Sequence, residues 1–262
     1  MNLSRSFAQG SEGFVEARSD SRMEEAVELR PDGILGWAEE ALLRVDPKLG
    51  AGLSTGQRRE ARKKVAARVA TVEAGAWPDE LSAPGLFGVL VVDGALIRRI
   101  VAGPGQSLEV LTKGDLVRPW QEESGAFGDS WFSSLGQSRL AVLDSGFAEE
   151  IARWPGLLEA FLERAIRRVR FLADQAALDS RVGMERRVLM TMWHLAKRCG
   201  TRTEAGIVIP LPLTHQMVSE LVGAQRPGVS VALSKLTTAG TLARTEDRGW
   251  LLDPASENNH SG

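Results

Sequence analysis

Two short amphipathic patterns near the C-terminal end of the chain follow one another with only three residues between them. The first, from Thr214 to Val222, starts at a residue typical of a helix N-cap and stops at Gly223, a typical helix end. The second starts at Arg226-Pro227, where proline suits the first turn. Its apolar stripe consists of Val229, Ala232, Leu233 and Leu236. Two helices joined this tightly predict a helix-turn-helix.

The opposite face of the second helix carries small or hydrogen-bonding groups behind an arginine. Its residues are Arg226, Pro227, Ser230, Val231, Ser234 and Lys235. Such a face suits the DNA major groove, because arginine can bridge guanine O6 and N7 while small groups contact base edges and thymine methyls. The alternative is a helix pair that only packs on its own domain.

A β-hairpin is predicted directly after Gly240. Leu242 and Arg244 alternate as in a strand, residues 246–249 form the turn, and residues 250–252 return. Arg244 or Arg248 at the tip of this wing would contact a phosphate, which positions a protein on DNA without reading its sequence. A solvated hairpin tip is the alternative.

The charge balance restricts where a polyanion can bind. The 262 residues include 32 Lys and Arg and 34 Asp and Glu, a net charge of -2, so the whole molecule has no attractive field for nucleic acid. Residues 183–253 contain nine basic and six acidic side chains, a local charge of +3, and the other residues carry -5. A surface that faces phosphate is therefore expected in the C-terminal part.

A long helix precedes this part. Residues 157–178 carry an apolar seam in which successive positions are four or three residues apart, as in a coiled coil. The seam consists of Leu158, Leu162, Ala165, Val169, Leu172 and Ala176. We expect this helix to pair two subunits; packing on its own domain is the alternative.

Short strands are predicted between residues 77 and 143. Residues 88–92 and 95–101 flank Asp93-Gly94 and predict a hairpin. Further strands are expected at 107–111, 115–120, 129–135 and 138–144, so that the region forms a small barrel or roll.

The N-terminal part is predicted to consist of a tail followed by helices. Residues 1–28 predict a flexible tail with a short helical piece at 23–29, and residues 34–72 predict helices with an apolar stripe of Val65, Val69 and Val72. The basic run RREARKKVAAR within it is interpreted as a solvated face, with nucleic-acid contact as the alternative.

The stretch LPLTHQMVSELVGAQRPGVSVALSKLTTAGTLARTEDRGWLL resembles the winged helix-turn-helix of Crp/Fnr-type bacterial transcription regulators. The order of a β-roll and then a long helix resembles the same family's cyclic-nucleotide-like sensor domain and dimerisation helix. The resemblance covers about residues 31–253 and implies an α+β fold. The expected units are a tail (1–30), helices with a β-roll (31–146), the dimerisation helix region (147–182), the winged helix-turn-helix (183–253) and a second tail (254–262).

The resemblance also implies residue roles. Arg226 falls on the family's recognition-helix arginine and Ser230 on a position that some members use for DNA contact. Pro227 stands where many members place glutamate, and Val231 where many place a second arginine, so a different operator is expected. Together with the reasoning from residues, the expected DNA-binding set is Gln225, Arg226, Ser230 and Ser234 toward bases or backbone, and Thr214, His215, Lys235 and Arg244 toward phosphates.

The sensor part shows no known ligand cassette. Cyclic-nucleotide-binding members of the family that the chain resembles bind ribose with a Gly-Glu pair and neutralise the cyclic phosphate with an Arg-Ser/Thr-Ala element. Here Gly114-Asp115 is followed by LVRPWQEESGAFGDSW, which contains no such element. Arg118 and Arg139 are the nearest basic candidates. Trp77, Trp120 and Trp131 would line a pocket or, more commonly, belong to the core.

Several other chemistries are excluded by composition. A single cysteine, Cys199, rules out a four-cysteine cluster, and none of the three histidines lies in the predicted roll, so neither a metal nor another cofactor is expected. Nucleotide-binding loops and nucleophile elbows are absent, so the chain is not expected to be an enzyme. Neither a signal peptide nor an apolar span is found, which indicates a cytoplasmic protein.

The sequence thus predicts a homodimeric, sequence-specific DNA-binding transcription regulator. The expected partners are double-stranded DNA, a second copy of the chain, RNA polymerase and an unidentified small-molecule effector, with no membrane. The alternative is a dimeric sensor or scaffold whose helix-turn-helix contacts protein.

Overall fold

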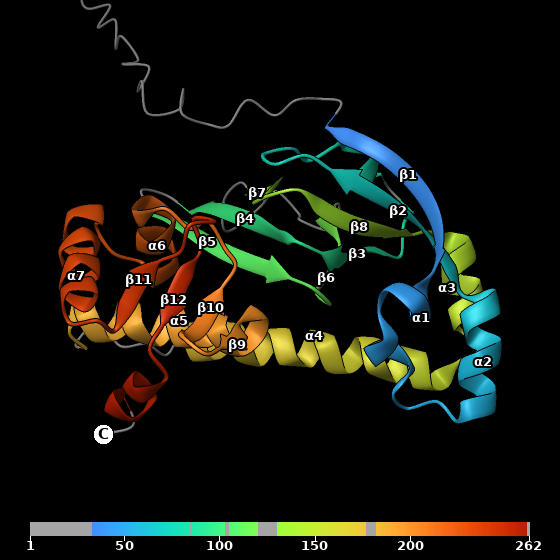
Figure 1. Ribbon diagram of the computed structural model, residues 1–262. Helices are drawn as coiled ribbons and strands as arrows, with labels where there is room; N and C mark the ends of the chain where they lie inside the picture. The colour runs from blue at the N-terminus through green and yellow to red at the C-terminus, as the bar shows by residue number, and fades with distance from the viewer. Residues whose placement is uncertain (1–32, 84, 103–104, 120–129, 177–181, 261–262) are drawn as a thin grey trace, which may run out of the picture.

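The computed structural model describes residues 33–83, 85–102, 105–119, 130–176 and 182–260 (Figure 1). Its N-terminal part is built on two antiparallel sheets. The first has the strand order β1 (Ile34–Ala41), β2 (Ala66–Val72), β8 (Ser138–Leu143), β3 (Gly88–Asp93) and β6 (Leu116–Val117). The second has the order β5 (Gly105–Thr112), β4 (Ala95–Ala102) and β7 (Ser130–Ser134). The N-terminal tail, with the helical piece expected at 23–29, lies outside the described residues.

Helices cover the outer face of the first sheet. They are α1 (Leu42–Val45), α2 (Thr55–Lys64), α3 (Ser145–Ile151) and the long α4 (Pro155–Ala176), with short 3-10 turns η1 (Pro47–Gly50) and η2 (Asp79–Ser82). Figure 1 shows α4 running beneath both sheets, from α2 at one end of the molecule to the C-terminal part at the other.

The predicted helix through Val65, Val69 and Val72 is wrong, because this segment is strand β2. Val69 packs with the helices α1 and α3, whereas Ala70 and Val72 face the second sheet. The expected helix before it is strand β1, and α2 ends at Lys64. Spacings of four and three residues fit a helical stripe, but a strand with apolar neighbours on both faces produces them too.

The predicted hairpin through Asp93-Gly94 is also wrong. Gly94 does adopt a positive φ of 79°, and a Cβ there would lie 2.8 Å from the carbonyl oxygen of Gln137. However, β3 pairs with β8 and β6, while β4 pairs with β5 and β7. The turn therefore passes the chain from one sheet to the other instead of closing a two-stranded ribbon.

The C-terminal part combines three helices with a third sheet. The helices are α5 (Met184–Cys199), α6 (His215–Val222) and α7 (Arg226–Thr238), followed by the 3-10 turn η4 (Pro254–His260). The sheet order is β11 (Leu242–Arg244), β12 (Trp250–Leu252), β10 (Gly206–Ile209) and β9 (Thr201–Thr203). The wing strands are confirmed, and the β9–β10 hairpin beside them was not predicted.

The C-terminal part packs directly on the second sheet of the roll. Ile97 and Val110 on the outer face of β4 and β5 share one core with α5, α6 and α7, whereas Leu96 and Leu111 point to the core between the two sheets. An ion pair joins Arg99 of β4 to Glu220 of α6 at 3.0 Å, with both side chains largely buried. The second sheet is thus buried on both faces.

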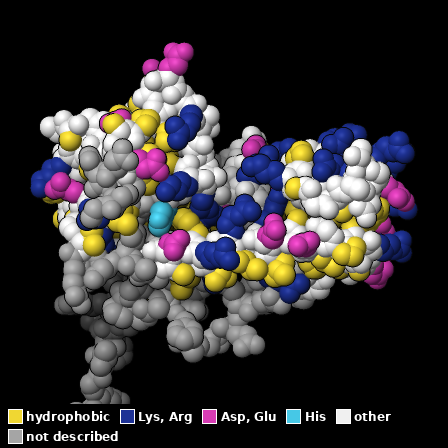
Figure 2. Space-filling model, turned by 90° about the horizontal axis from the view of Figure 1, so that it is seen from below, with side chains coloured by type: hydrophobic (Ala, Val, Ile, Leu, Met, Phe, Trp, Pro, Cys, Tyr) yellow, Lys and Arg dark blue, Asp and Glu magenta, His cyan; other side chains and the backbone are white. Residues whose placement is uncertain are grey.

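The seam of α4 is exposed on the single chain. Leu157 and Phe161 point into the core, but Leu158, Leu162 and Val169 are 39%, 61% and 65% exposed. Figure 2 views the molecule from the α4 side and shows hydrophobic side chains in a line along the long body. Ile166, outside the predicted seam, is exposed beside it. An apolar row of this length on the surface indicates an interaction site.

Candidate nucleic-acid interface

The helix-turn-helix forms at the residues that the sequence predicts. The side chain of Thr214 caps α6 by accepting a hydrogen bond from the backbone N–H of Met217 at 3.2 Å. Gly223 ends α6 in the left-handed region at φ 61°, which glycine adopts without steric cost. Gln225 is the N-cap of α7, and the predicted stripe from Val229 to Leu236 is buried.

The outer face of α7 is open to solvent. Arg226, Pro227, Ser234 and Lys235 are exposed, and Val231 is 57% exposed. Among the described residues, none accepts a hydrogen bond or an ion pair from Arg226, so its five N–H donors are available to a ligand. In Figure 1, α7 stands at the end of the molecule that is farthest from α2.

Two candidates on this face already have protein partners. Lys235 Nζ lies 2.6 Å from Glu185 Oε1 of α5, and both side chains are about half exposed. Ser230 Oγ lies 3.1 Å from His215 Nδ1, which ties the start of α6 to the first turns of α7. An exposed pair contributes little stability, so Lys235 is able to exchange its carboxylate for a phosphate.

His215 sits between the two helices and the wing. Its ring stacks at 6.4 Å from the ring of Trp250. The pKa of His215 is lowered from its ordinary value by burial and, to a smaller extent, by the positive charges of Arg244 and Arg226. The ring is therefore neutral at pH 7 in the free protein.

Arg244 is held by the protein itself. Its guanidinium donates hydrogen bonds to the carbonyl oxygens of Arg248 at 2.8 Å and Leu213 at 2.7 Å, and lies 3.7 Å from the Trp250 ring centroid. Burial lowers its pKa. These contacts fix the wing against the segment before α6, and the expected phosphate contact of Arg244 stays a prediction. Arg244 and Arg248 are both exposed.

Gly228 is a candidate that the sequence reasoning missed. It is exposed in the first turns of α7, and a Cβ built there would meet no atom within 4 Å. A helix backbone without a side chain at this position permits close approach of another backbone. A glycine between Pro227 and the buried stripe was the available signal.

The ligand candidates of the roll are engaged in other contacts. Arg118 donates to the carbonyl oxygen of Phe87 at 2.6 Å, and Arg139 pairs with Glu40 of β1. Asp115, at the position of the expected ribose contact, pairs with Arg198 of α5 and accepts from the backbone N–H of Thr112 at 2.6 Å. Burial raises the pKa of Asp115 above its ordinary value, an effect that Arg198 opposes.

Two further residues are structural or inert: Trp77 in the sensor part and Cys199 at the end of α5. Trp77 stacks on Phe132 at 4.8 Å and packs against the core between the sheets, Trp131 is half-buried, and Trp120 lies outside the described residues. Burial raises the pKa of the Cys199 thiol to about 11, which leaves it protonated at neutral pH. Within the described ranges, no three His, Cys, Asp or Glu side chains are grouped as metal ligands would be.

Comparison with known proteins agrees with this geometry. The family model of the Crp-like helix-turn-helix domain matches residues 167–256. Residues 167–256 form a Crp-like helix-turn-helix domain. No curated protein sequence shows a significant match to the chain.

Solved structures share the fold over most of the chain. A CooA mutant from Carboxydothermus hydrogenoformans superposes with a TM-score of 0.55 at 16% identity, covering 84% of this chain and 94% of its own. FixK2 from Bradyrhizobium japonicum gives 0.54 at 19% identity, covering 69% and 90%. A cyclic nucleotide-binding domain containing protein from Listeria monocytogenes gives 0.56 at 16% identity, covering 81% and 99%. The predicted α+β fold, a cyclic-nucleotide-binding-like roll followed by a winged helix-turn-helix, is confirmed.

Proposed function

We propose that this Crp-like protein is a sequence-specific, homodimeric DNA-binding transcription regulator of the cytoplasm. The observation that supports it most is the open outer face of α7, a helix whose other face is buried. This face begins with Arg226, for which the described residues offer no hydrogen-bond or ion-pair partner. The match of residues 167–256 to the Crp-like helix-turn-helix domain also supports the proposal, and CooA and FixK2 share the fold. In the described part of the chain, no helix is long and apolar enough to cross a membrane.

The proposed arrangement places two α7 helices in successive major grooves of a pseudo-palindromic site. The α4 seam pairs the subunits, and the half-sites lie about one helical turn, roughly 34 Å, apart. Arg226 reads a base, Gln225, Ser230 and Ser234 add contacts, and Thr214, His215, Lys235 and Arg244 face phosphates. Thr214 stands at the N-terminus of α6, where backbone N–H groups favour an anion.

A salt titration tests DNA binding against the scaffold alternative. Phosphate neutralisation releases counterions, so the logarithm of the DNA affinity should fall linearly and steeply with the logarithm of salt concentration. Fluorescence anisotropy with a labelled duplex measures this slope. A flat response, or no binding at any salt concentration, would favour a module that contacts protein.

Replacement of Arg226 by alanine should weaken binding to the preferred duplex by about 1 to 3 kcal/mol and relax the preference at one base pair per half-site. The side chain is exposed and unpartnered among the described residues, so folding should not change. Arg202→Ala, an exposed arginine on β9, is the matched control. An unchanged preference at every position would show that Arg226 does not read a base.

DNA affinity should increase as the pH falls from 8 to 6. The lowered pKa of His215 keeps the ring neutral in the free protein, and a nearby phosphate would raise that pKa, so binding takes up a proton. His215→Gln keeps a polar side chain but cannot titrate, and the pH dependence should disappear. Anisotropy titrations at constant ionic strength measure both proteins. Equal slopes for the two would place His215 away from the phosphates.

A further inference from the structure

A basic cavity lies at the junction of the roll, α4 and α5. It has a volume of about 760 Å³ and is lined from four separate segments of the chain: η1, the turn after β5, one flank of α4 and the end of α5. In Figure 2 dark-blue side chains gather around the hollow in the middle of this face. Among the described residues of segment 116–131, where the resemblance would put a cyclic-phosphate cassette, none lines the cavity.

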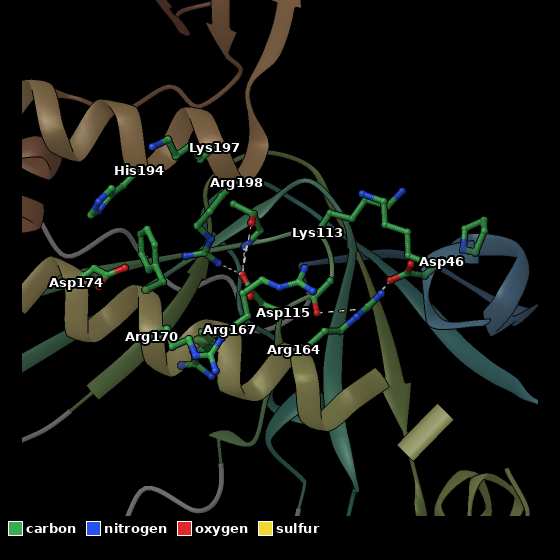
Figure 3. A pocket seen from close by; sticks show the side chains of 16 residues that line it. Asp46, Lys113, Asp115, Arg164, Arg167, Arg170, Asp174, His194, Lys197 and Arg198 are labelled. Atoms are coloured by element: carbon green, nitrogen blue, oxygen red, sulfur yellow. Dashed lines mark hydrogen bonds and ion pairs between the residues drawn. The ribbon is translucent and has the colours of Figure 1, made fainter. Parts of the chain in front are cut away.

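The inner arginines of this cavity are neutralised by the protein. Arg164 pairs with Asp46 at 2.6 Å, and Arg198 pairs with Asp115. Behind them Arg168 makes a two-pronged contact with one carboxylate, as its Nε and Nη2 lie 2.7 and 2.9 Å from the oxygens of buried Glu109. The Arg198–Asp115 pair joins α5 to the β5–β6 turn, and Arg164 joins α4 to the same turn by donating to the carbonyl oxygen of Gly114 at 3.3 Å (Figure 3). The pairs of Arg164 with Asp46 and of Arg168 with Glu109 hold α4 against the start of η1 and against β5.

The lysine and arginine side chains at the outer rim of the cavity are not neutralised by described carboxylates in the way the inner arginines are. Among the described residues, no carboxylate pairs with the exposed side chains of Lys48, Lys113, Arg167 or Arg170. Among the described residues, Lys197 pairs with the partly exposed Glu257, at 3.6 Å. Figure 3 shows Lys113 and the α4 arginines around one opening, with acidic Asp174 farther along the helix. The lining contains eight Lys and Arg against three Asp.

Such a concentration of unpaired positive charge attracts anions. Like charges that share a concave wall repel one another, and the low-dielectric protein around them strengthens the field in the hollow. A ligand with several negative charges removes this repulsion, whereas a single carboxylate does not. The ring of Phe171 forms a flat wall beside the cations. Arg198 Cζ lies 4.3 Å from its centroid, and the centroid of the His194 ring lies 5.6 Å from it.

We propose that this cavity binds a small-molecule anion that carries two or more phosphate groups, such as a nucleoside polyphosphate. Lys113, Arg167 and Arg170 contact the phosphates, and the wall at Phe171 accommodates an attached base. The size is in the range of ligand pockets. The hollow lies in the middle of the face seen in Figure 2, whereas α7 stands at one end of the molecule (Figure 1), so DNA bound at α7 would not fill the cavity. This inference does not depend on the proposed function.

Calorimetric titration of the purified full chain, without DNA, tests the proposal. The probes are tripolyphosphate, adenosine triphosphate and adenosine at matched ionic strength. Both polyphosphates should bind and adenosine should not; tighter binding of adenosine triphosphate would show that the base contributes. The Arg167→Ala/Arg170→Ala variant should lose about tenfold in affinity for each cation removed. The matched control is Arg62→Ala/Lys63→Ala, two exposed cations of α2.

Three results would overturn the proposal. They are the absence of binding by both polyphosphates, an equal loss of affinity in the α2 control, and binding of adenosine alone. If the cavity variant binds polyphosphates normally but loses affinity for duplex DNA, the cations contact the DNA backbone and the proposal is wrong. Circular dichroism of each variant verifies folding, which removal of exposed side chains should leave intact.

Discussion

Replacement of Leu162 and Val169 by glutamate should convert the protein from a dimer into a monomer. Both side chains are more than half exposed on the single chain and lie on the predicted seam of α4. Withdrawing an apolar side chain of this size from water contributes about 1.5 to 3 kcal/mol. Because each replacement occurs on both chains of a homodimer, four such side chains are lost, and association should weaken by at least about 10⁴-fold. Burial of the new carboxylates would weaken it further.

Sedimentation velocity over a range of concentrations measures this change. The wild type should sediment with the mass of two chains and the variant with the mass of one, while the circular dichroism of both stays the same. Leu35→Glu, which places the same charge at an exposed apolar residue of β1, is the control and should remain dimeric. A monomeric wild type, or a variant that still dimerises, would show that the seam does not pair the subunits.

Truncation of Glu220 to alanine should lower the free energy of unfolding by about 3 to 5 kcal/mol. The change leaves the guanidinium of Arg99 in a largely buried position without its carboxylate, at the contact between the roll and α6. It also removes the oxygen that accepts a hydrogen bond from Gln216 at 3.0 Å. Because the contact joins two parts of the chain, their unfolding transitions should separate.

Denaturant unfolding at 25 °C, followed by circular dichroism and tryptophan fluorescence, measures both effects. The double variant Arg99→Met/Glu220→Leu should recover much of the loss, since it leaves no unpaired buried charge. Glu60→Ala breaks the exposed pair with Lys64 and should change stability by less than about 1 kcal/mol. If Glu220→Ala lowered the free energy of unfolding as little as Glu60→Ala does, the result would contradict a buried ion pair between the roll and α6.

Local signals predicted the helix-turn-helix closely. Thr214, Gly223 and Pro227 act on the backbone within one turn of their own position, so their effect is visible in the sequence. The observed bounds of α6 and α7 follow from them. The seam of α4 was predicted for the same reason, because its apolar period is a property of one helix.

Long-range strand pairing was not predictable in the same way. Strand β3 pairs with β8, about fifty residues later in the chain, and nothing in residues 88–93 indicates that partner. The helix-forming Ala and Glu residues of 37–41 lie on the edge strand β1, where exposure permits them. Tertiary pairing overrides local preference in such strands.

For the candidate sites too, features of a single helix could be predicted from the sequence, whereas contacts between separate elements could not. The exposed face of α7 follows from the helical period, so Arg226 and Ser234 were identified correctly as exposed residues. The contacts that hold Arg244, Lys235 and His215 depend on partners from other elements. The basic cavity brings together four distant segments, and its charges are unremarkable in each segment alone.

Selection of bound fragments from randomised duplex DNA by the purified protein, without added ligand, tests the central claim most directly. Our account predicts an enriched two-fold motif whose half-sites are about 10 base pairs apart, and loss of one position per half-site when Arg226→Ala is selected in parallel. Failure to enrich any motif, with polyphosphate absent and again with it present, would contradict sequence-specific DNA binding and favour a protein-binding module.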